Sequence, residues 1–326
     1  MLAAPGTRRQ QPADPGDPNG RSLAAPANRF LRLLAAGVPI MADGPMGTRL
    51  AEAGLSPGQA PEAWLLEPRG REAVRGVHRA YREAGARILL TDSFGGSPAR
   101  LVAHGLGGRV AELNRVAAEV ARAEAAEAGA ERPVVVAGSI GPTGELLAPL
   151  GSLSEDEAAD GFAEQAAALA AGGADVLWIE TMSDLAEVEA AVTGCRRGAP
   201  ELPVVATLTF GSRGATVMGV RPAAAAAALV RLGVAAGGVN CGSGSADVEP
   251  VVAAMHAAAP ALVLVAKPNA GLPRVEAGQT VYPETPAEMA IGIARLRDAG
   301  AAILGSCCGG SPDHLRAIAA MLRTDG

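Results

Sequence analysis

Two adjacent cysteines, Cys307 and Cys308, stand at the end of an apolar run in a chain that has only four cysteines. Two buried thiols or a vicinal disulfide would explain the pair structurally. Two ligands of one metal ion are the chemical explanation, which needs a further ligand from elsewhere. Cys241 also ends an apolar run and is the candidate, whereas Cys195 falls in a helical pattern. Three thiolates suit Zn²⁺ and leave one tetrahedral position open, as in catalytic zinc sites.

A zinc ion held by three thiolates carries a net negative charge and is a poor electrophile. Such an ion is suited to binding a substrate thiol, because metal binding deprotonates a thiol whose pKa is ~8.5 in water. The product is an oriented thiolate, which is a good nucleophile toward a methyl group on a cationic donor. The three cysteines therefore predict methyl transfer to sulfur.

Cys241 can reach the cysteine pair only in a fold that gathers distant segments, and the sequence predicts such a fold. Short apolar runs alternate with Ala-rich helical patterns, and they cover residues 40–44, 87–94, 134–139, 175–180, 203–210, 237–241, 262–269 and 302–307. Runs without polar alternation are typical of strands covered on both faces. Gly85, Gly173 and Gly300 end helical patterns, as expected of C-cap glycines. We predict a single-domain α/β protein, a closed (β/α)8 TIM barrel, rather than a doubly wound open sheet.

In such barrels the active site lies at the carboxyl ends of the strands. The unusual polar residues of this sequence fall there, namely Asp43, Asp92, Ser93, Glu180, Asn240, Lys267 and Asn269. Structural roles compete with functional ones, because Asp43 before Gly44 could make a turn and Glu180 could cap the helix that begins near Ser183. Both paired cysteines reach one metal only if the strand stops between them.

Composition and charge restrict the class of protein. The formal net charge is -6 and the pI about 5.4, which argues against a nucleic-acid or anionic-membrane partner. Residues 1–28 are rich in Pro, Gly, Ala and Arg and lack the apolar block of a signal peptide, so we expect a disordered tail before a barrel domain at 29–326. No run reaches the ~18 apolar residues of a membrane span. Free thiols favour a cytoplasmic protein.

Six motifs in this order resemble those of the homocysteine S-methyltransferase family. They are "MADGPMGTRL", "LLTDSFGG", "VAGSIGPTGE", "DVLWIET", "GGVNCGSG" and "GSCCGGSPDHL". The resemblance covers roughly residues 37–324 and implies that Cys241, Cys307 and Cys308 hold Zn²⁺. It also implies that Asp43 and Glu180 are the catalytic residues that hold the homocysteine amino group. Carboxylates suit this role because they accept hydrogen bonds from an ammonium.

Three further residues complete the expected substrate site. We expect the amides around Gly44 and the "SFGG" turn, which contains Ser93, to receive the homocysteine carboxylate. Asn240 is expected to support Cys241 more than to touch the substrate. Homocysteine and a small methyl donor are the expected partners, and homo-oligomerisation stays open.

The methyl donor differs among members of the family, which use betaine, S-methylmethionine or a corrinoid-bound methyl group from folate. The "GQAPEAW" stretch and the compact length resemble bacterial betaine-type members, so betaine is favoured and S-methylmethionine is close behind. A quaternary ammonium favours an aromatic cage, for which this sequence offers few candidates: Phe94, Trp178 and Tyr282. Two other interpretations are a barrel lyase or isomerase with Lys267 as a Schiff-base residue, and a non-catalytic methyl-binding or scaffold subunit.

Overall fold

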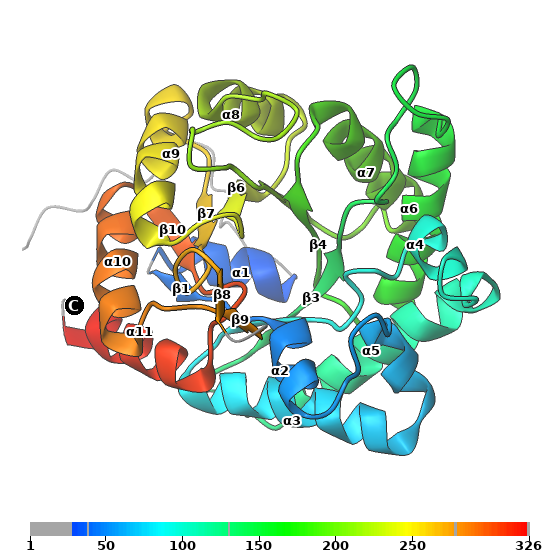
Figure 1. The fold of residues 1–326 in the computed structure, drawn as a ribbon, viewed down its shortest axis with the longest axis horizontal. Coiled ribbons are helices and arrows are strands. Elements are labelled where there is room, and N and C mark those ends of the chain that lie inside the picture. Colours follow the sequence, from blue (N-terminus) through cyan, green and yellow to red (C-terminus); the bar gives the residue numbers. More distant parts are fainter. Residues whose placement is uncertain (1–27, 38, 130, 277–278, 325–326) are drawn as a thin grey trace, which may run out of the picture.

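The computed structural model describes residues 28–324 apart from 38, 130, 277 and 278, and it contains the expected barrel (Figure 1). Eight parallel strands form one sheet in the order β1-β10-β7-β6-β5-β4-β3-β2. Their bounds are β1 Ile40–Met41, β2 Ile88–Leu90, β3 Val135–Ile140, β4 Val176–Met182, β5 Val204–Leu208, β6 Ala236–Asn240, β7 Leu264–Lys267 and β10 Ala301–Leu304. All eight expected strands are present, and the prediction of a (β/α)8 barrel is confirmed.

The barrel closes between its first two strands. Ala42 and Ile88 form an isolated parallel bridge, and the Arg87 amide donates to the Met41 carbonyl at 2.7 Å. The Asp43 amide donates to the Ile88 carbonyl at 3.1 Å. These bonds join β1 to β2, so the carboxyl ends of all eight strands surround one opening.

Helices form the outer layer around the sheet (Figure 1). Their bounds are α2 Met46–Glu52, α3 Pro68–Ala84, α4 Pro98–Val102, α5 Val110–Ala126, α6 Glu155–Ala171, α7 Leu185–Gly198, α8 Pro222–Arg231, α9 Ser245–Ala258, α10 Pro286–Asp298 and α11 Pro312–Thr324, with 3-10 turns η1 at Pro61–Leu66 and η2 at Gly107–Arg109. Capping boxes begin α6, at Ser154 with Glu157, and α10, at Thr285 with Glu288. Each box satisfies two backbone amides that a helix start leaves free. Gly85 adopts the left-handed φ of 112° that closes α3.

A short helix that the sequence did not predict, α1 (Arg29–Ala35), lies across the amino-terminal end of the barrel. Its Phe30 and Leu33 are buried against the apolar interior of the barrel, which includes Trp178 and Val176. Burying an aromatic side chain of this size contributes about 2 kcal/mol. The helix therefore closes the end of the barrel opposite to the strand carboxyl ends.

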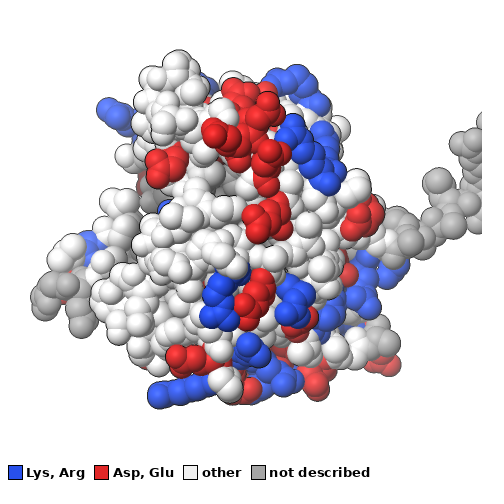
Figure 2. Space-filling model, turned by 90° about the vertical axis from the view of Figure 1, so that its right-hand side faces the viewer, with Lys and Arg blue, Asp and Glu red and all other residues white. Residues whose placement is uncertain are grey.

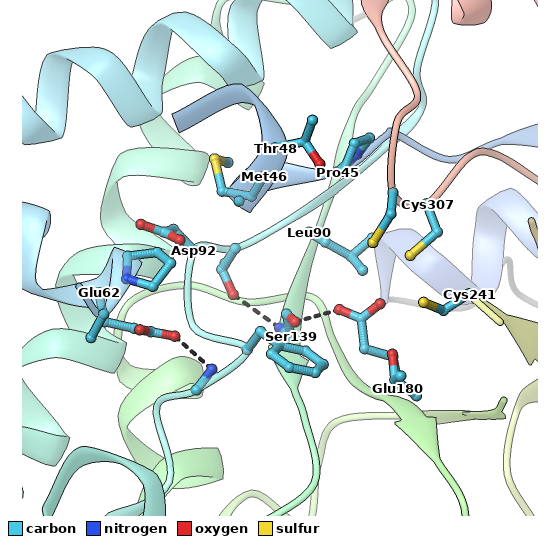
Figure 3. Close-up of a pocket in the computed structure, with 18 of the residues that line it drawn as sticks. Pro45, Met46, Thr48, Glu62, Leu90, Asp92, Ser139, Glu180, Cys241 and Cys307 are labelled. Atoms are coloured by element: carbon cyan, nitrogen blue, oxygen red, sulfur yellow. Dashed lines mark hydrogen bonds between the residues drawn. The ribbon is translucent and has the colours of Figure 1, made fainter. Parts of the chain in front are cut away.

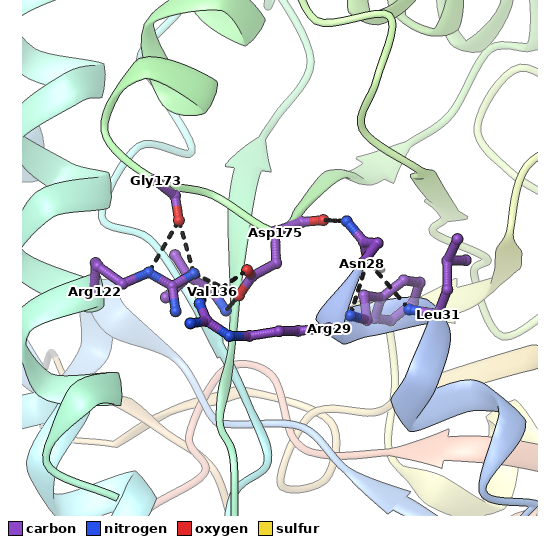
Figure 4. Close-up of polar contacts among 8 residues, drawn as sticks. Asn28, Arg29, Leu31, Arg122, Val136, Gly173 and Asp175 are labelled. Carbon is purple, nitrogen blue, oxygen red and sulfur yellow. Dashed lines mark hydrogen bonds and ion pairs between the residues drawn. The ribbon is translucent and has the colours of Figure 1, made fainter. Parts of the chain in front are cut away.

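A polar network attaches α1 to the barrel (Figure 4). The Asp175 carboxylate accepts a hydrogen bond from the Val136 amide at 2.9 Å and forms ion pairs with Arg122 and Arg29. The Asp175 carbonyl accepts from Asn28 Nδ2 at 2.8 Å. Asn28 was expected in the tail but is the N-cap of α1; residues 1–27 lie outside the described part of the chain.

A second unpredicted element is a small antiparallel hairpin, β8 (Arg274–Glu276) with β9 (Gln279–Val281), in the segment between β7 and α10.

On the face shown in Figure 2, acidic and basic side chains are intermixed. Within the described ranges, no helix combines the length and the apolar character needed to cross a membrane.

Candidate active site

The carboxyl ends of the strands surround a cavity of about 610 Å³ (Figure 3). The carboxyl-terminal parts of β3, β4 and β7 and the segments that follow β1, β2, β6 and β10 contribute to its wall. The site therefore lies where a TIM barrel places its chemistry. The volume falls in the range of small-molecule pockets, which is ~300–1,000 Å³.

The cysteine cluster, Cys241, Cys307 and Cys308, lies in this wall with its sulfur atoms all within 4.8 Å of one another. All three cysteines are half-buried and none forms a disulfide. Cys241 directly follows β6. The paired cysteines follow β10, which ends at Leu304, so the strand stops before both of them and not between them as expected. The turn that follows brings both sulfurs to one side, and Gly309 permits it with φ 79°.

The chemistry of the cluster fits a zinc ion. Ligands at ~2.3 Å in a tetrahedral arrangement place two sulfurs ~3.8 Å apart, which is compatible with three sulfurs that lie within 4.8 Å of one another. Hydrogen bonds from Cys241 and then from Cys307 hold the pKa of Cys308 well below that of an ordinary thiol. The cluster therefore favours one thiolate, at Cys308, which is the form that binds zinc, whereas the pKa values of Cys241 and Cys307 are raised.

Backbone strain marks the residues around the cluster. Thr181 (φ 65°) and Cys241 (φ 60°) are, in the described part of the chain, the residues other than glycine with positive φ. Left-handed backbone is costly for a β-branched residue such as Thr181. Asn240, the residue before Cys241, contacts the strained segment and the cysteine pair. Its Oδ1 accepts a hydrogen bond from the Thr181 amide at 2.8 Å, and its Nδ2 lies 4.0 Å from the Cys307 sulfur. Asn240 is fully buried and does not line the cavity, and its supporting role stays a prediction.

Glu180 lines the cavity beside the cysteines (Figure 3). Its Oε1 accepts a hydrogen bond from Ser139 Oγ at 2.6 Å, and burial raises its pKa although Lys267 lowers it. The alternative in which Glu180 caps a helix is wrong, because Asp184 is the N-cap of α7 and accepts from the Ala186 amide. A buried carboxylate facing a cavity is suited to bind a cationic group.

Asp43 and Lys267 form a buried ion pair, with Oδ1 and Nζ 2.9 Å apart. The other oxygen of Asp43 accepts from the Leu90 amide at 2.7 Å, and Asp43 does not line the cavity. Lys267 does line it. Burial opposes the charge of this ammonium, but Asp43 and Glu180 outweigh burial and raise the pKa of Lys267. The sequence placed Lys267 at the carboxyl end of its strand and suggested a rim salt bridge or a Schiff base; the salt bridge is present, and the sequence did not identify Asp43 as its partner.

Gly44 and Ser93 were both expected near the substrate carboxylate, but only Gly44 lines the cavity. Gly44 lines the cavity, and a Cβ there would lie 2.8 Å from the Tyr81 ring. The Ser93 hydroxyl donates to the Ser139 carbonyl at 2.7 Å and is not part of the wall. Ser306, which the sequence did not single out, lines the cavity with a buried Oγ that has no partner among the described residues.

The chain is similar to known proteins in sequence and in fold. The family model described as "Homocysteine S-methyltransferase" matches residues 40–322. A methionine synthase from Mycobacterium tuberculosis is 34% identical over 293 residues, which are 86% of this chain and 24% of that protein. The chain thus spans about a quarter of the length of that relative.

Solved structures are also similar to this chain. The oxidized form of the homocysteine methyltransferase MmuM from Escherichia coli superposes with a TM-score of 0.72 at 27% identity, covering 90% of this chain and 99% of that one. Its metallated form gives a TM-score of 0.69 over 88% and 98% of the two chains. The structure of GH5_18 from Streptomyces cattleya superposes with a TM-score of 0.52 at 13% identity over 88% and 80% of the two chains, a likeness that shows the fold alone.

Proposed function

The chain belongs to the homocysteine S-methyltransferase family and is a methyltransferase, and we propose that it methylates homocysteine to methionine with a small cationic donor. In this reaction the acceptor sulfur loses its proton and forms a bond to the methyl carbon. The electron pair of the broken donor bond stays with the donor, which leaves uncharged. The observation that supports the proposal is the cluster of three cysteine sulfurs within 4.8 Å in the wall of a substrate-sized cavity.

We further propose zinc as the cofactor, with Cys241, Cys307 and Cys308 as its ligands. Three soft sulfur donors in one group support zinc over Mg²⁺ or Ca²⁺, which prefer oxygen. When bound, the ion supplies the Lewis acidity that makes a substrate thiol a thiolate at neutral pH. The open side of the cysteine cluster faces the cavity, so an acceptor in the cavity can approach it.

The residues of the chain orient homocysteine. Glu180 faces the cavity and binds the substrate ammonium. Asp43 can add a contact to that ammonium only beside Lys267, because its two carboxylate oxygens already accept hydrogen bonds from Lys267 and from the Leu90 amide. The Ser306 hydroxyl and the backbone around Gly44 receive the substrate carboxylate. The turn that contains Ser93 is less suited to this role than expected, because its Ser93, Gly95 and Gly96 amides already donate within the protein. Asn240 keeps the segments at Thr181 and Cys241 in place.

The donor belongs to a class that includes betaine and S-methylmethionine. Of the three aromatic residues considered for a cage, only Phe94 is part of the cavity wall. Trp178 is fully buried inside the barrel, and Tyr282 contacts Cys308. The structure thus offers less support for betaine than the sequence did. A donor methyl delivered from a corrinoid or folate remains an alternative within the same reaction.

The lyase or isomerase alternative needs a neutral Lys267 amine as nucleophile. A Schiff-base lysine has a lowered pKa, whereas the Asp43 and Glu180 carboxylates raise the pKa of this one. The ion pair with Asp43 therefore argues against that chemistry. A cytoplasmic location remains a proposal based on the free cysteines.

The test is methionine formation from homocysteine with a panel of donors, together with the zinc content of the purified protein. We expect one zinc per chain and turnover with at least one cationic donor. Glu180→Gln should keep the zinc and raise the homocysteine KM by ~10- to 100-fold, since a hydrogen bond to a charged group is worth ~1.5–3 kcal/mol. The exposed Glu189→Gln is the matched control. Zinc-loaded protein that forms no methionine with any donor would support the scaffold alternative instead.

A further inference from the structure

Two carboxylates outside the proposed homocysteine site, Glu62 and Asp92, line the same cavity on the side away from the cysteine cluster (Figure 3). Glu62 belongs to the turn η1, and Asp92 lies two residues beyond the end of β2. They are 3% and 4% exposed. Two acids so deeply buried in a cavity wall need a reason, because burial disfavours their charge.

The Glu62 carboxylate is held in place by the backbone opposite. Its Oε1 accepts a hydrogen bond from the Gly95 amide at 2.5 Å. A Cβ at position 95 would lie 2.9 Å from the same oxygen, so a side chain there would displace the Glu62 carboxylate. The position of this acid is therefore set before any ligand enters.

Asp92 lacks a comparable partner. Its Oδ2 is buried and forms no hydrogen bond within the described residues. Buried polar atoms without partners are uncommon in native proteins, and each one calls for an explanation such as a ligand. An acceptor oxygen in a cavity wall is explained by a ligand that donates a hydrogen bond.

The electrostatics of the two acids point to a cation. Burial, and next the charge of Glu62, raise the pKa of Asp92. Burial also raises the pKa of Glu62, against the smaller opposing effects of its hydrogen bonds and of Arg100 and His104. Arg100 also lies over the Phe94 ring, 6.0 Å from its centroid, and lines the cavity. A further cation between the two acids would stabilise both carboxylates, while Arg100 remains for an anionic group of the same ligand.

We propose that Glu62 and Asp92 are specificity-determining residues that bind a primary ammonium group of the methyl donor, so that among the donors used in the family they select a sulfonium with an amino-acid head group. The inference rests on the proposed methyl transfer at the cysteine side of the cavity. Homocysteine occupies the side of Glu180 and the cysteines, and the donor head group occupies the side of Glu62, Asp92 and Arg100. The donor sulfonium then lies between the two ends.

Two physical reasons favour a primary ammonium over the reacting cation itself. An ammonium donates hydrogen bonds to carboxylates, whereas a quaternary ammonium or a sulfonium has no hydrogen to donate. In the reaction the bond from methyl carbon to donor sulfur breaks and its electron pair remains on that sulfur, which becomes a neutral thioether. Carboxylates against the reacting sulfonium would stabilise the reactant more than the transition state. The ammonium keeps its charge throughout, so binding it carries no such penalty.

The experiment compares two sulfonium donors with the zinc-loaded full-length protein. S-methylmethionine carries an ammonium, and dimethylsulfoniopropionate has the same dimethylsulfonium and a carboxylate but no ammonium. Asp92→Asn and Glu62→Gln remove charge at nearly constant shape, and a glutamine can still accept from the Gly95 amide. Glu112→Gln, at an exposed glutamate, is the control. Calorimetric binding of S-methylmethionine provides a measurement that does not depend on turnover.

We expect the wild type to prefer S-methylmethionine. Each cavity variant should lower kcat/KM for S-methylmethionine by at least ~10-fold through KM, since each removes a hydrogen bond between charged groups. The homocysteine KM and the use of dimethylsulfoniopropionate should stay unchanged, and calorimetry should show the same loss of affinity. Unchanged S-methylmethionine binding in both variants, or equal losses for the two donors, would overturn the ammonium site. If S-methylmethionine binds to the wild type but no donor yields methionine, the proposed function fails and the ammonium site stands.

Discussion

The two ends of the barrel use charged residues in opposite ways. At the amino-terminal end, every oxygen of Asp175 has a partner, and the network holds α1 in place (Figure 4). At the carboxyl end, the cavity wall contains the unpartnered oxygens of Asp92 and Ser306 and the strained backbone of Thr181 and Cys241. Satisfied polar groups stabilise the fold, whereas unsatisfied ones and strain are retained where a ligand uses them.

The difference follows from the geometry of a parallel barrel. Helix α1 covers the amino-terminal end, where the oxygens of Asp175 are paired within the protein. The loops after the strands are free to converge on a cavity. Variants at the carboxyl end should therefore affect activity, and variants at the other end should affect stability.

The largest effect is expected for Cys307→Ala. Loss of one of three sulfur ligands should remove the metal and reduce turnover by more than the ~100-fold that loss of a supporting residue costs. The checks are zinc per chain and methionine formation, with circular dichroism to show that the fold is kept. Cys195→Ala, at the buried cysteine of α7, is the control and should keep its zinc. A Cys307→Ala enzyme with full activity would refute the cysteine site.

Lys267→Met tests a residue at the carboxyl end that also stabilises the fold, through its ion pair with Asp43. The change leaves the Asp43 charge buried without its partner, which should reduce the free energy of unfolding by ~3–5 kcal/mol. Urea denaturation measures this loss. The double variant Lys267→Met with Asp43→Asn removes both charges and should recover most of the stability. No recovery would show that Lys267 contributes through contacts other than the ion pair.

Asp175→Ala tests the opposite end. The change leaves the Val136 amide without its acceptor and breaks the ion pairs with Arg122 and Arg29, so we expect a loss of ~1–3 kcal/mol in unfolding free energy. Zinc content, kcat and the homocysteine KM should be unchanged. A drop in kcat at unchanged stability would contradict the division between the two ends.

The smallest effect is expected for Arg197→Ala on the outer helix α7. Arg197 pairs with the exposed Asp156 and Asp160, and exposed pairs contribute only ~0–1 kcal/mol. Thermal unfolding should change little and activity not at all. A loss as large as that of Asp175→Ala would show that the surface pairs form a more cooperative network than their exposure suggests.

The fold was predictable because its signals are local. Eight apolar runs, the C-cap glycines and the capping boxes at Ser154 and Thr285 each reflect contacts within a few residues of chain. Alternation of these elements implies a parallel sheet, and eight repeats of strand and helix favour a closed barrel. Helix α1 and the hairpin β8–β9 lacked such signals. Phe30 and Leu33 make α1 apolar on one side, but only the end of the barrel provides what covers them.

The cysteine cluster was predictable for a related reason. Each cysteine follows an apolar run, and the ends of these runs meet at one rim of a barrel. The sequence and its motifs therefore predicted that all three cysteines lie together. The partners of charged residues were not predictable in this way. Lys267 and Asp43 are 224 residues apart and were assigned separately, although they form one ion pair.

The sequence by itself determined the barrel, the three sulfurs at its rim and the family, because each depends on residue type at a position along one strand or turn. Only the tertiary structure decided which charges are buried, which neutralise one another and which remain free. Lys267 is paired with Asp43, whereas Asp92 keeps a buried oxygen without a partner among the described residues. Burial and pairing depend on segments that meet only after folding, and the cost of a buried charge depends on those partners.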